Sequence, residues 1–221
     1  RQPARPLIEG SPVIFWMANA VAVAAAYLLG SIPTGYLAGR LLAGIDLREH
    51  GSGSTGATNV LRSVGKWPAA GVLAVDVLKG VAAIVLARWL FARLDAPDSS
   101  QAWTVCLAGV AVLLGHSRSI WLGFPGGKSA ATGLGVLLGM SWPVGAGAAA
   151  FSLSCWAIFR IVSLGSLAAA STAIALVCIL TEPWPYRLLV VAGGLYVIAL
   201  HRANIRRLMA GTEPRIGRKL S

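Results

Sequence analysis

Long apolar runs constrain the fold of this chain more than any other feature of its sequence. The first run extends from about Val13 to Leu29 and continues toward Leu42, and others follow at about 68–91, 102–121, 129–142, 144–159, 164–181 and 188–201. A helix needs about 20 mainly apolar residues to cross about 30 Å of hydrocarbon. The pattern therefore predicts an all-α, polytopic integral membrane helix bundle with about seven transmembrane helices.

Composition excludes a water-soluble domain. Of the 221 residues, 56% are hydrophobic and 12% are charged, whereas charged residues make up about 25% of soluble domains. In a soluble protein, a net charge of +11 would suggest a nucleic-acid partner. Here Lys and Arg cluster in short loops between apolar runs, as in membrane proteins, so we expect no nucleic acid as partner. The three cysteines lie far apart within apolar runs, without the spacing of a zinc site.

One domain boundary follows from this pattern. Residues 1–11 are predicted to be an N-terminal extension or leader, and residues 12–221 a single transmembrane domain. A cleaved secretory signal is the alternative for the first run, but Gly35-x-x-x-Gly39 favours a helix-packing face in a retained span. The short runs at 129–142 and 144–159 are separated only by Ser141-Trp-Pro143, so a broken or re-entrant helix pair is the alternative to two full crossings.

The loop charges predict the orientation. If seven spans alternate, five cations fall on one side and thirteen on the other; Lys79 lies within a span. Cytoplasmic loops carry the excess of Lys and Arg, so the N-terminus is expected outside and the C-terminus inside. The thirteen are Arg40, Arg48, Arg62, Lys66, Arg118, Lys128, Arg160, Arg202, Arg206, Arg207, Arg215, Arg218 and Lys219.

The first loop with a chemical signature is Arg48–Arg62. Its glycines let backbone N–H groups approach an anion, its hydroxyl and amide side chains add hydrogen-bonding groups, and arginine offers a bidentate fork for phosphate. A flexible polar linker is the alternative. The loop is predicted to bind an anion, with Ser52, Gly53, Gly56, Thr58, Asn59 and Arg62 as its candidate residues.

The second loop, Gly115–Thr132, contains Gly126-Gly-Lys-Ser129. It is not a nucleotide P-loop, because Leu122 stands where that motif needs glycine and no buried strand precedes it. A glycine pair and a lysine that open a helix at Ser129 still favour an anion. This segment therefore predicts phosphate binding without ATP chemistry, through His116, Gly126, Gly127 and Lys128.

Two further sets of polar residues have structural and functional interpretations. His201 and Asn204 lie three apart at the end of the last span, where they share a helix face or belong to a basic collar at the lipid headgroups. Asp76 and Lys79 lie three apart inside the second span. A self-neutralising structural pair is the simpler interpretation, and a functional site is the alternative.

Several short motifs recur in one order and together resemble a known family. They are Gly30-Ser-Ile-Pro-Thr-Gly35, Gly51-Ser-Gly-Ser-Thr-Gly-Ala-Thr-Asn-Val60 with Arg62, Asp76 with Lys79-Gly80, Gly115-His116, Gly126-Gly-Lys128 with Ala131-Thr132, His201-x-x-Asn204-Ile with Arg207-Leu, and Gly211-Thr-Glu213. In this the chain resembles the acyl-phosphate:glycerol-3-phosphate acyltransferases of bacterial inner membranes, the PlsY family. The resemblance covers residue 30 to the C-terminus.

The resemblance implies a seven-helix enzyme of phospholipid synthesis in the bacterial cytoplasmic membrane, with its active-site loops on the cytoplasmic side. It would transfer a fatty acyl group from acyl phosphate to the 1-hydroxyl of glycerol 3-phosphate, giving lysophosphatidic acid and phosphate. Catalytic roles map onto Ser52, Arg62, Lys128, His201 and Asn204. The chain departs from the family at Pro125 and Ser129, where lysine and glycine are usual; Arg118 is the candidate to replace the missing cation.

Three mechanisms are compatible with these residues. Direct attack, with the acyl phosphate's own phosphate accepting the proton, is our first hypothesis; His201 as general base and a Ser52 acyl-enzyme are its rivals. We expect a monomer in contact with membrane lipid, no cofactor, no metal, insensitivity to EDTA and no requirement for acyl-CoA. A transporter of organic phosphate esters is the alternative function, although the sequence shows no internal repeat of the kind common in transporters.

Overall fold

The structure is a computed structural model of the chain and describes residues 12–94, 98–180 and 182–217. In this part of the chain the regular elements are all helical, which confirms the predicted class. The predicted extension of residues 1–11 and the cations Arg218 and Lys219 lie outside the described residues. The α-helices are α1 (Pro12–Ser31), α2 (Thr34–Ala43), α3 (Ala57–Ser63), α4 (Lys66–Phe91), α5 (Asp98–Ser117), α6 (Ala130–Met140), α7 (Trp142–Phe159), α8 (Val162–Ile179), α9 (Trp184–Leu200) and α10 (Arg202–Met209), and the short 3-10 helices are η1 (Leu47–Glu49) and η2 (Ile120–Leu122).

Length and apolar character identify the helices able to cross a membrane. Five described segments qualify: α1 together with α2, then α4, α5, α7 and α8. A sixth qualifies if α9 and α10, which meet at an angle of 60°, count as one span. Each predicted span corresponds to a helix, but α6 has only 11 residues. At about 1.5 Å per residue it is too short to cross about 30 Å of hydrocarbon alone.

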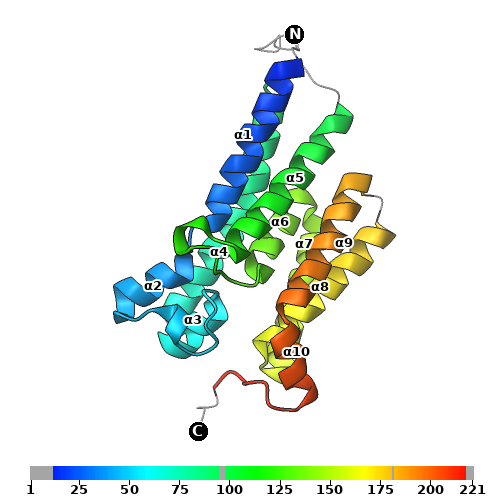
Figure 1. Cartoon of the computed structure of the whole chain (residues 1–221). Coiled ribbons are helices and arrows are strands. Elements are labelled where there is room, and N and C mark those ends of the chain that lie inside the picture. Colours follow the sequence, from blue (N-terminus) through cyan, green and yellow to red (C-terminus); the bar gives the residue numbers. More distant parts are fainter. Residues whose placement is uncertain (1–11, 95–97, 181, 218–221) are drawn as a thin grey trace.

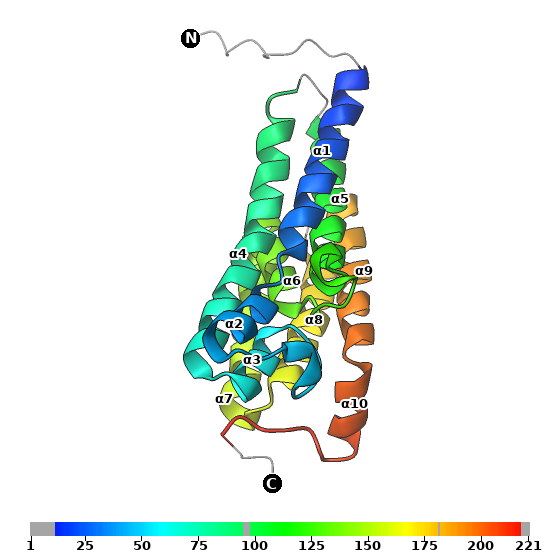
Figure 2. The same ribbon diagram turned by 60° about the vertical axis from the view of Figure 1, so that its left-hand side comes forward.

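The helices pack in two groups, which are joined through α6 and through direct contact of α5 with α9 (Figures 1 and 2). In one group α1 packs along α5 and α4; in the other, α7, α8 and α9 pack in chain order. Helix α6 packs closely on α4 and also contacts α7, α8 and α9. Gly80 and Gly135 allow the approach to α4, because a Cβ on either would overlap the opposite backbone, at Thr132 O and Val77 O respectively. Such close backbone contact is typical of membrane helices that pack through small residues.

Polar groups hold the C-terminal end of the short helix α6. Arg88 of α4 donates to the carbonyls of Gly139 (2.8 Å) and Met140 (2.9 Å) and to the hydroxyl of Tyr186 (3.3 Å). A cation at a helix C-terminus donates hydrogen bonds to the free carbonyls there, and it interacts favourably with the negative end of the helix dipole. The break at Ser141 separates α6 from α7 as the sequence predicted, and Arg88 stabilises the shorter half.

The remaining short helices gather at one end of the bundle. Figure 1 shows α2, α3 and α10 at the end opposite the start of α1, and Figure 2 shows the same grouping from another side. The chain turns by 60° between α9 and α10, at His201. The segments Arg48–Arg62 and His201–Glu213 therefore lie at this end.

Candidate active site

A cavity of about 270 Å³ lies where the three polar segments meet. Its walls come from the loop before α3, α3, α4, the end of α5, the loop before α6, the N-terminal half of α6, α7, α8 and the segment from His201 to Ile216. Gly53, Gly126 and Gly127 lie outside its lining. The other nine of the twelve predicted site residues line it: Ser52, Gly56, Thr58, Asn59, Arg62, His116, Lys128, His201 and Asn204.

The first loop is organised around Asn59, which is 1% exposed. Its Oδ1 accepts from the amide of Ser52 (3.0 Å), and its Nδ2 donates to the carbonyls of Leu47 (3.0 Å), His50 (2.9 Å) and Ser54 (2.9 Å). These bonds use the amide to shape the loop, because buried polar atoms need such partners. Contact between Asn59 and a ligand stays a prediction. Ser52, on the same loop, is exposed at the cavity.

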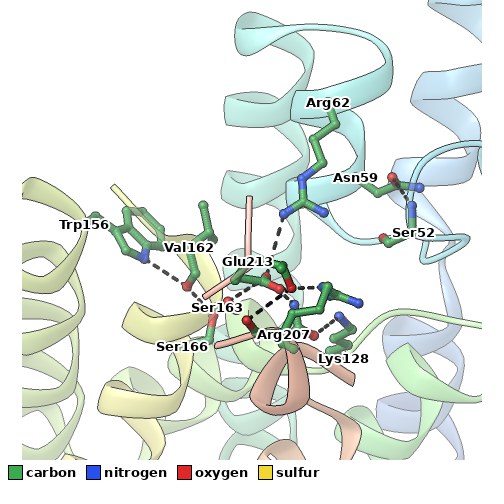
Figure 3. A network of polar contacts seen from close by, with 12 residues as sticks. Ser52, Asn59, Arg62, Lys128, Trp156, Val162, Ser163, Ser166, Arg207 and Glu213 are labelled. Atoms are coloured by element: carbon green, nitrogen blue, oxygen red, sulfur yellow. Dashed lines mark hydrogen bonds and ion pairs between the residues drawn. The ribbon is translucent and has the colours of Figure 1, made fainter. Parts of the chain in front are cut away.

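Glu213 lies between the cationic side chains of the site (Figure 3). Its Oε2 accepts from Arg207 Nε at 2.6 Å, and its Oε1 lies 3.9 Å from an Arg62 nitrogen. Oε1 also accepts from Ser163 Oγ at 2.8 Å and from Asn204 Nδ2 at 2.7 Å. The carboxylate, whose side chain is 1% exposed, thus joins α3, α8, α10 and the C-terminal segment.

Lys128 completes this network from the loop before α6. Its Nζ donates to Asn204 Oδ1 at 2.5 Å. Burial lowers the pKa of Lys128 below its ordinary value, and the nearby positive charges of Arg207 and Arg62 act in the same direction against the attraction of Glu213. Lys128 and Arg62 both line the cavity, so two cations from separate segments face the same space. Such an arrangement favours an anionic ligand, above all a phosphate.

The glycine pair before Lys128 packs directly on His116. The amide of Gly127 donates to the carbonyl of His116 at 3.0 Å. A Cβ on Gly127 would overlap the His116 imidazole, and one on Gly126 would overlap the His116 carbonyl. The two glycines are therefore needed for the loop backbone to approach His116 closely. They do not line the cavity, but they set the position of the loop that carries Lys128.

Ser129 and Arg118 bear on the two departures from the family pattern. Ser129 precedes α6 with φ +57, in the left-handed region that favours glycine. Its hydroxyl donates to the carbonyl of Leu113 at 2.8 Å, so serine has an anchor that glycine lacks. Arg118 is exposed and lies outside the cavity lining. The structure therefore gives no support to Arg118 as the replacement for a lysine at Pro125.

His201 and Asn204 both reach the cavity, but not from one straight helix. His201 lies at the break between α9 and α10, and Asn204 lies in the first turn of α10. His201 Nδ1 is 2.8 Å from the carbonyl of Val197. Because a carbonyl only accepts, Nδ1 carries a hydrogen, and in the neutral ring Nε2 is the acceptor. Both residues are buried, which differs from the exposed basic collar considered as an alternative.

Several residues that line the cavity or contact its lining were not identified as candidates from the sequence. Glu213 and Arg207 were noted only as parts of a motif, and Ser152, Trp156, Ser163 and Ser166 lie within or beside apolar runs. Ser163 and Ser166 are three residues apart and so share a face of α8. That spacing is the sequence signal that hydroxyl groups line one side of an otherwise apolar helix.

An apolar space lies beside the polar cavity, inside the bundle. It measures about 60 Å³ and is lined almost entirely by apolar residues and glycines of α5, α6, α7, α8 and α9. Ala130, Leu134, Ser166 and Ala169 line both spaces. A ligand with a charged head and an apolar tail would therefore find both kinds of surface next to each other.

Comparison with known proteins assigns the family. A sequence model described as "Glycerol-3-phosphate acyltransferase" matches residues 20–211. The chain belongs to this glycerol-3-phosphate acyltransferase family. It is 64% identical over 217 residues to glycerol-3-phosphate acyltransferase 2 of Rhizobium johnstonii, covering 93% of this chain and 99% of that protein. It is 54% identical to glycerol-3-phosphate acyltransferase of Trichormus variabilis, covering 90% and 92%.

Solved structures give the same assignment. The glycerol 3-phosphate form of PlsY (YgiH), an integral membrane glycerol 3-phosphate acyltransferase, superposes with a TM-score of 0.82 at 36% identity, covering 90% of this chain and 96% of that chain. The lysophosphatidic acid form of the same enzyme gives 0.78 at 35% identity, with coverages of 90% and 95%. The acyltransferase interpretation is thereby confirmed, and the comparisons give no support to the transporter alternative.

Proposed function

We propose that this chain transfers a fatty acyl group from acyl phosphate to the 1-hydroxyl of glycerol 3-phosphate, releasing lysophosphatidic acid and inorganic phosphate. One observation carries the proposal: a cavity faced by Arg62 and Lys128 adjoins an apolar space inside the bundle. Family membership supports the acceptor, because the matched solved structure is a glycerol 3-phosphate form. The acyl phosphate donor rests on the chemistry that follows.

Charge is the first requirement of this reaction. The phosphate groups of the two substrates together bring about four negative charges at neutral pH. Arg62, Lys128 and Lys66 line the cavity, and Arg207 donates a hydrogen bond to Glu213. A phosphate that enters would share Arg62 with Glu213, whose carboxylate is 3.9 Å away. Phosphate binding by the chain's own cations needs no bridging metal ion, which is why we expect EDTA to leave the rate unchanged.

The acyl donor fits the apolar space beyond the cations. With its phosphate at Arg62 and Lys128, an acyl phosphate would direct its chain past Leu134 and Ala169 into the space lined by α8 and α9. Burial of each methylene contributes about 0.8 kcal/mol. The carbonyl would then lie at the boundary between the two spaces, where the polar residues of the cavity end.

The chemical step follows from this placement. The 1-hydroxyl oxygen attacks the carbonyl carbon, the bond from that carbon to the phosphate oxygen breaks, and the hydroxyl proton passes to the departing phosphate. Because phosphate is a good leaving group, positioning and charge stabilisation supply much of the rate. Arg62 and Lys128 stabilise the departing phosphate, and His201 helps to position glycerol 3-phosphate while the hydroxyl proton points toward the phosphate. Ser52 Oγ has no base within hydrogen-bonding distance among the described contacts, which favours direct attack over an acyl-enzyme.

The proposed orientation places the cavity on the cytoplasmic side of the bacterial inner membrane. The cavity is built by segments from the side with more cations, including Arg62, Lys66 and Lys128, and such segments stay cytoplasmic. We propose seven helices in the membrane, from α1, α4, α5, α6, α7, α8 and α9, with α6 held as a partial span by Arg88.

The enzyme would work as a monomer, because one chain supplies the whole cavity.

The test is release of phosphate by purified protein in detergent or lipid, supplied with palmitoyl phosphate with and without glycerol 3-phosphate. We expect release that requires both substrates and falls at least about 100-fold in Lys128→Ala. Palmitoyl-CoA in place of palmitoyl phosphate should give no lysophosphatidic acid. Equal product from palmitoyl-CoA would refute the proposed donor, and no product from either donor in protein that melts cooperatively would refute the function.

A further inference from the structure

The carboxylate of Asp76, inside α4, contacts three separate segments of the chain. Its Oδ1 accepts from Thr34 Oγ1 at 2.6 Å and lies 2.8 Å from Lys79 Nζ. The same oxygen is 3.6 Å from Nδ1 of His116 on α5. Asp76 is fully buried, yet it borders the polar cavity, as does His116. The carboxylate therefore connects the start of α2, the middle of α4 and the end of α5 beside the proposed substrate site.

Neutralising Lys79 does not by itself explain this arrangement. A buried ion pair rarely stabilises a protein more than well-packed apolar side chains would, because both charges lose hydration. Among the residues that the structure describes, Asp76 Oδ2 has no hydrogen-bond partner. This adds to the free-energy cost of burying the carboxylate. Buried charges retained at a cost are explained best by what they hold in place, and the partner of Asp76 nearest to the site chemistry is His116.

His116 is the support on which the glycine pair rests. Its carbonyl accepts the Gly127 amide at 3.0 Å. The Nε2 edge of its ring lies against Gly127, so a Cβ there would overlap it. The Nδ1 edge faces Asp76. The carboxylate thus faces one side of the imidazole at 3.6 Å, within ion-pair distance of a protonated ring, and the opposite side packs against the loop that carries Lys128.

We propose that Asp76 is a positioning residue for the reaction: by holding His116 through Nδ1, it fixes the surface under Gly127 and thereby the place of the Lys128 ammonium in the cavity. The inference rests on the proposed function, in which Lys128 binds a substrate phosphate. Asp76 acts through His116 and the loop and does not itself contact substrate.

The test is steady-state kinetics of full-length Asp76→Asn in detergent or lipid. Gly127→Ala, which displaces the loop directly, first identifies the substrate whose KM depends on the loop. Asp76→Asn should raise the same KM by about tenfold and change kcat by less than about threefold, because the lost interaction is one of binding. Thr34→Val removes another partner of Asp76 that does not touch the loop, and it should leave that KM unchanged.

A double-mutant cycle with His116→Gln separates positioning from general destabilisation. If Asp76 acts through His116, the double variant should show about the same KM as either single variant, since coupled residues are not additive. KM effects that multiply, or an Asp76→Asn variant with a lower Tm and an unchanged KM, would overturn the proposal. His116→Gln leaves the Asp76–Lys79 pair intact and serves alone if Asp76→Asn does not fold; an unchanged KM for it would also overturn the proposal.

Failure of this inference and failure of the proposed function give different results. Wild-type turnover with both substrates is measured first in the same preparation. Turnover in the wild type with no KM effect in the variants rejects only the positioning role of Asp76, whereas absence of wild-type turnover rejects the proposed reaction.

Discussion

Lys128 donates to Asn204 across 76 positions of sequence, from the loop before α6 to the first turn of α10, at 2.5 Å. The other end of the Asn204 amide donates to Glu213 at 2.7 Å. A neutral side chain therefore stands between a cation and a carboxylate, and it keeps Lys128 in the cavity without neutralising it. The charge of Lys128 thus stays available to a substrate phosphate.

This arrangement predicts the effect of Asn204→Asp. A second carboxylate beside Lys128 would compete with the substrate phosphate and would meet Glu213 as a like charge. We expect KM for a phosphate substrate to rise at least about tenfold, in line with the 1–3 kcal/mol typical of a lost charge-assisted hydrogen bond. Steady-state kinetics measure it, with Arg202→Gln, an exposed change on the same helix, as control. An unchanged KM in Asn204→Asp would show that Lys128 does not bind phosphate.

The lowered pKa of Lys128 predicts an alkaline limit to activity. Burial, together with Arg207 and Arg62, lowers this pKa below the ordinary 10.5. The protonated form binds phosphate, so kcat/KM should fall as pH rises through the lowered pKa of Lys128. In Lys128→Arg the cation persists at every accessible pH, so the fall should disappear, whatever the activity at neutral pH. The pH profile, corrected for spontaneous hydrolysis of acyl phosphate, measures this; equal alkaline falls in both proteins would assign the limit to another group.

Ser129 predicts an order of stabilities. A left-handed backbone costs an L-residue about 1–2 kcal/mol, and the Ser129 hydroxyl bond to Leu113 O returns about 1 kcal/mol. Ser129→Gly removes both, so its Tm should stay close to that of the wild type. Ser129→Ala keeps the strain and loses the bond, so its Tm should be lower by a few degrees. Thermal unfolding in one detergent compares the three, and a Ser129→Gly variant less stable than Ser129→Ala would contradict this explanation.

Much of the fold follows from the sequence because the bilayer imposes it. Apolar runs long enough for membrane helices are visible in the residues themselves, and each predicted span has a helix at nearly the same bounds. Helix α6 shows the limit of this signal. Whether an 11-residue apolar helix ends inside the bundle depends on partners such as Arg88, which is 51 residues from its acceptor Gly139.

The candidate site was predicted where local sequence carries the chemistry. Lys128 after two glycines and Arg62 after a glycine-rich loop are local patterns that predict phosphate binding, and both line the cavity. Glu213 was not predicted as a site residue, because its importance comes from Arg62, Ser163 and Arg207 in other elements. Likewise, Asp76 and Lys79 read as a self-contained pair until the fold brings His116 beside them.

The apolar space beyond the polar cavity predicts how acyl-chain preference can be changed. Ala173 is 2% exposed and lines this space but not the polar cavity, so Ala173→Leu should shorten the room for the chain and leave the phosphate site intact. We expect kcat/KM for palmitoyl phosphate to fall about tenfold, the loss of two buried methylenes, while that for lauroyl phosphate changes little. Ala175→Leu makes the same change at an exposed position of α8 and should alter neither rate. Lysophosphatidic acid formation with each donor measures this preference, and an equal fall for both donors would place the acyl chain elsewhere.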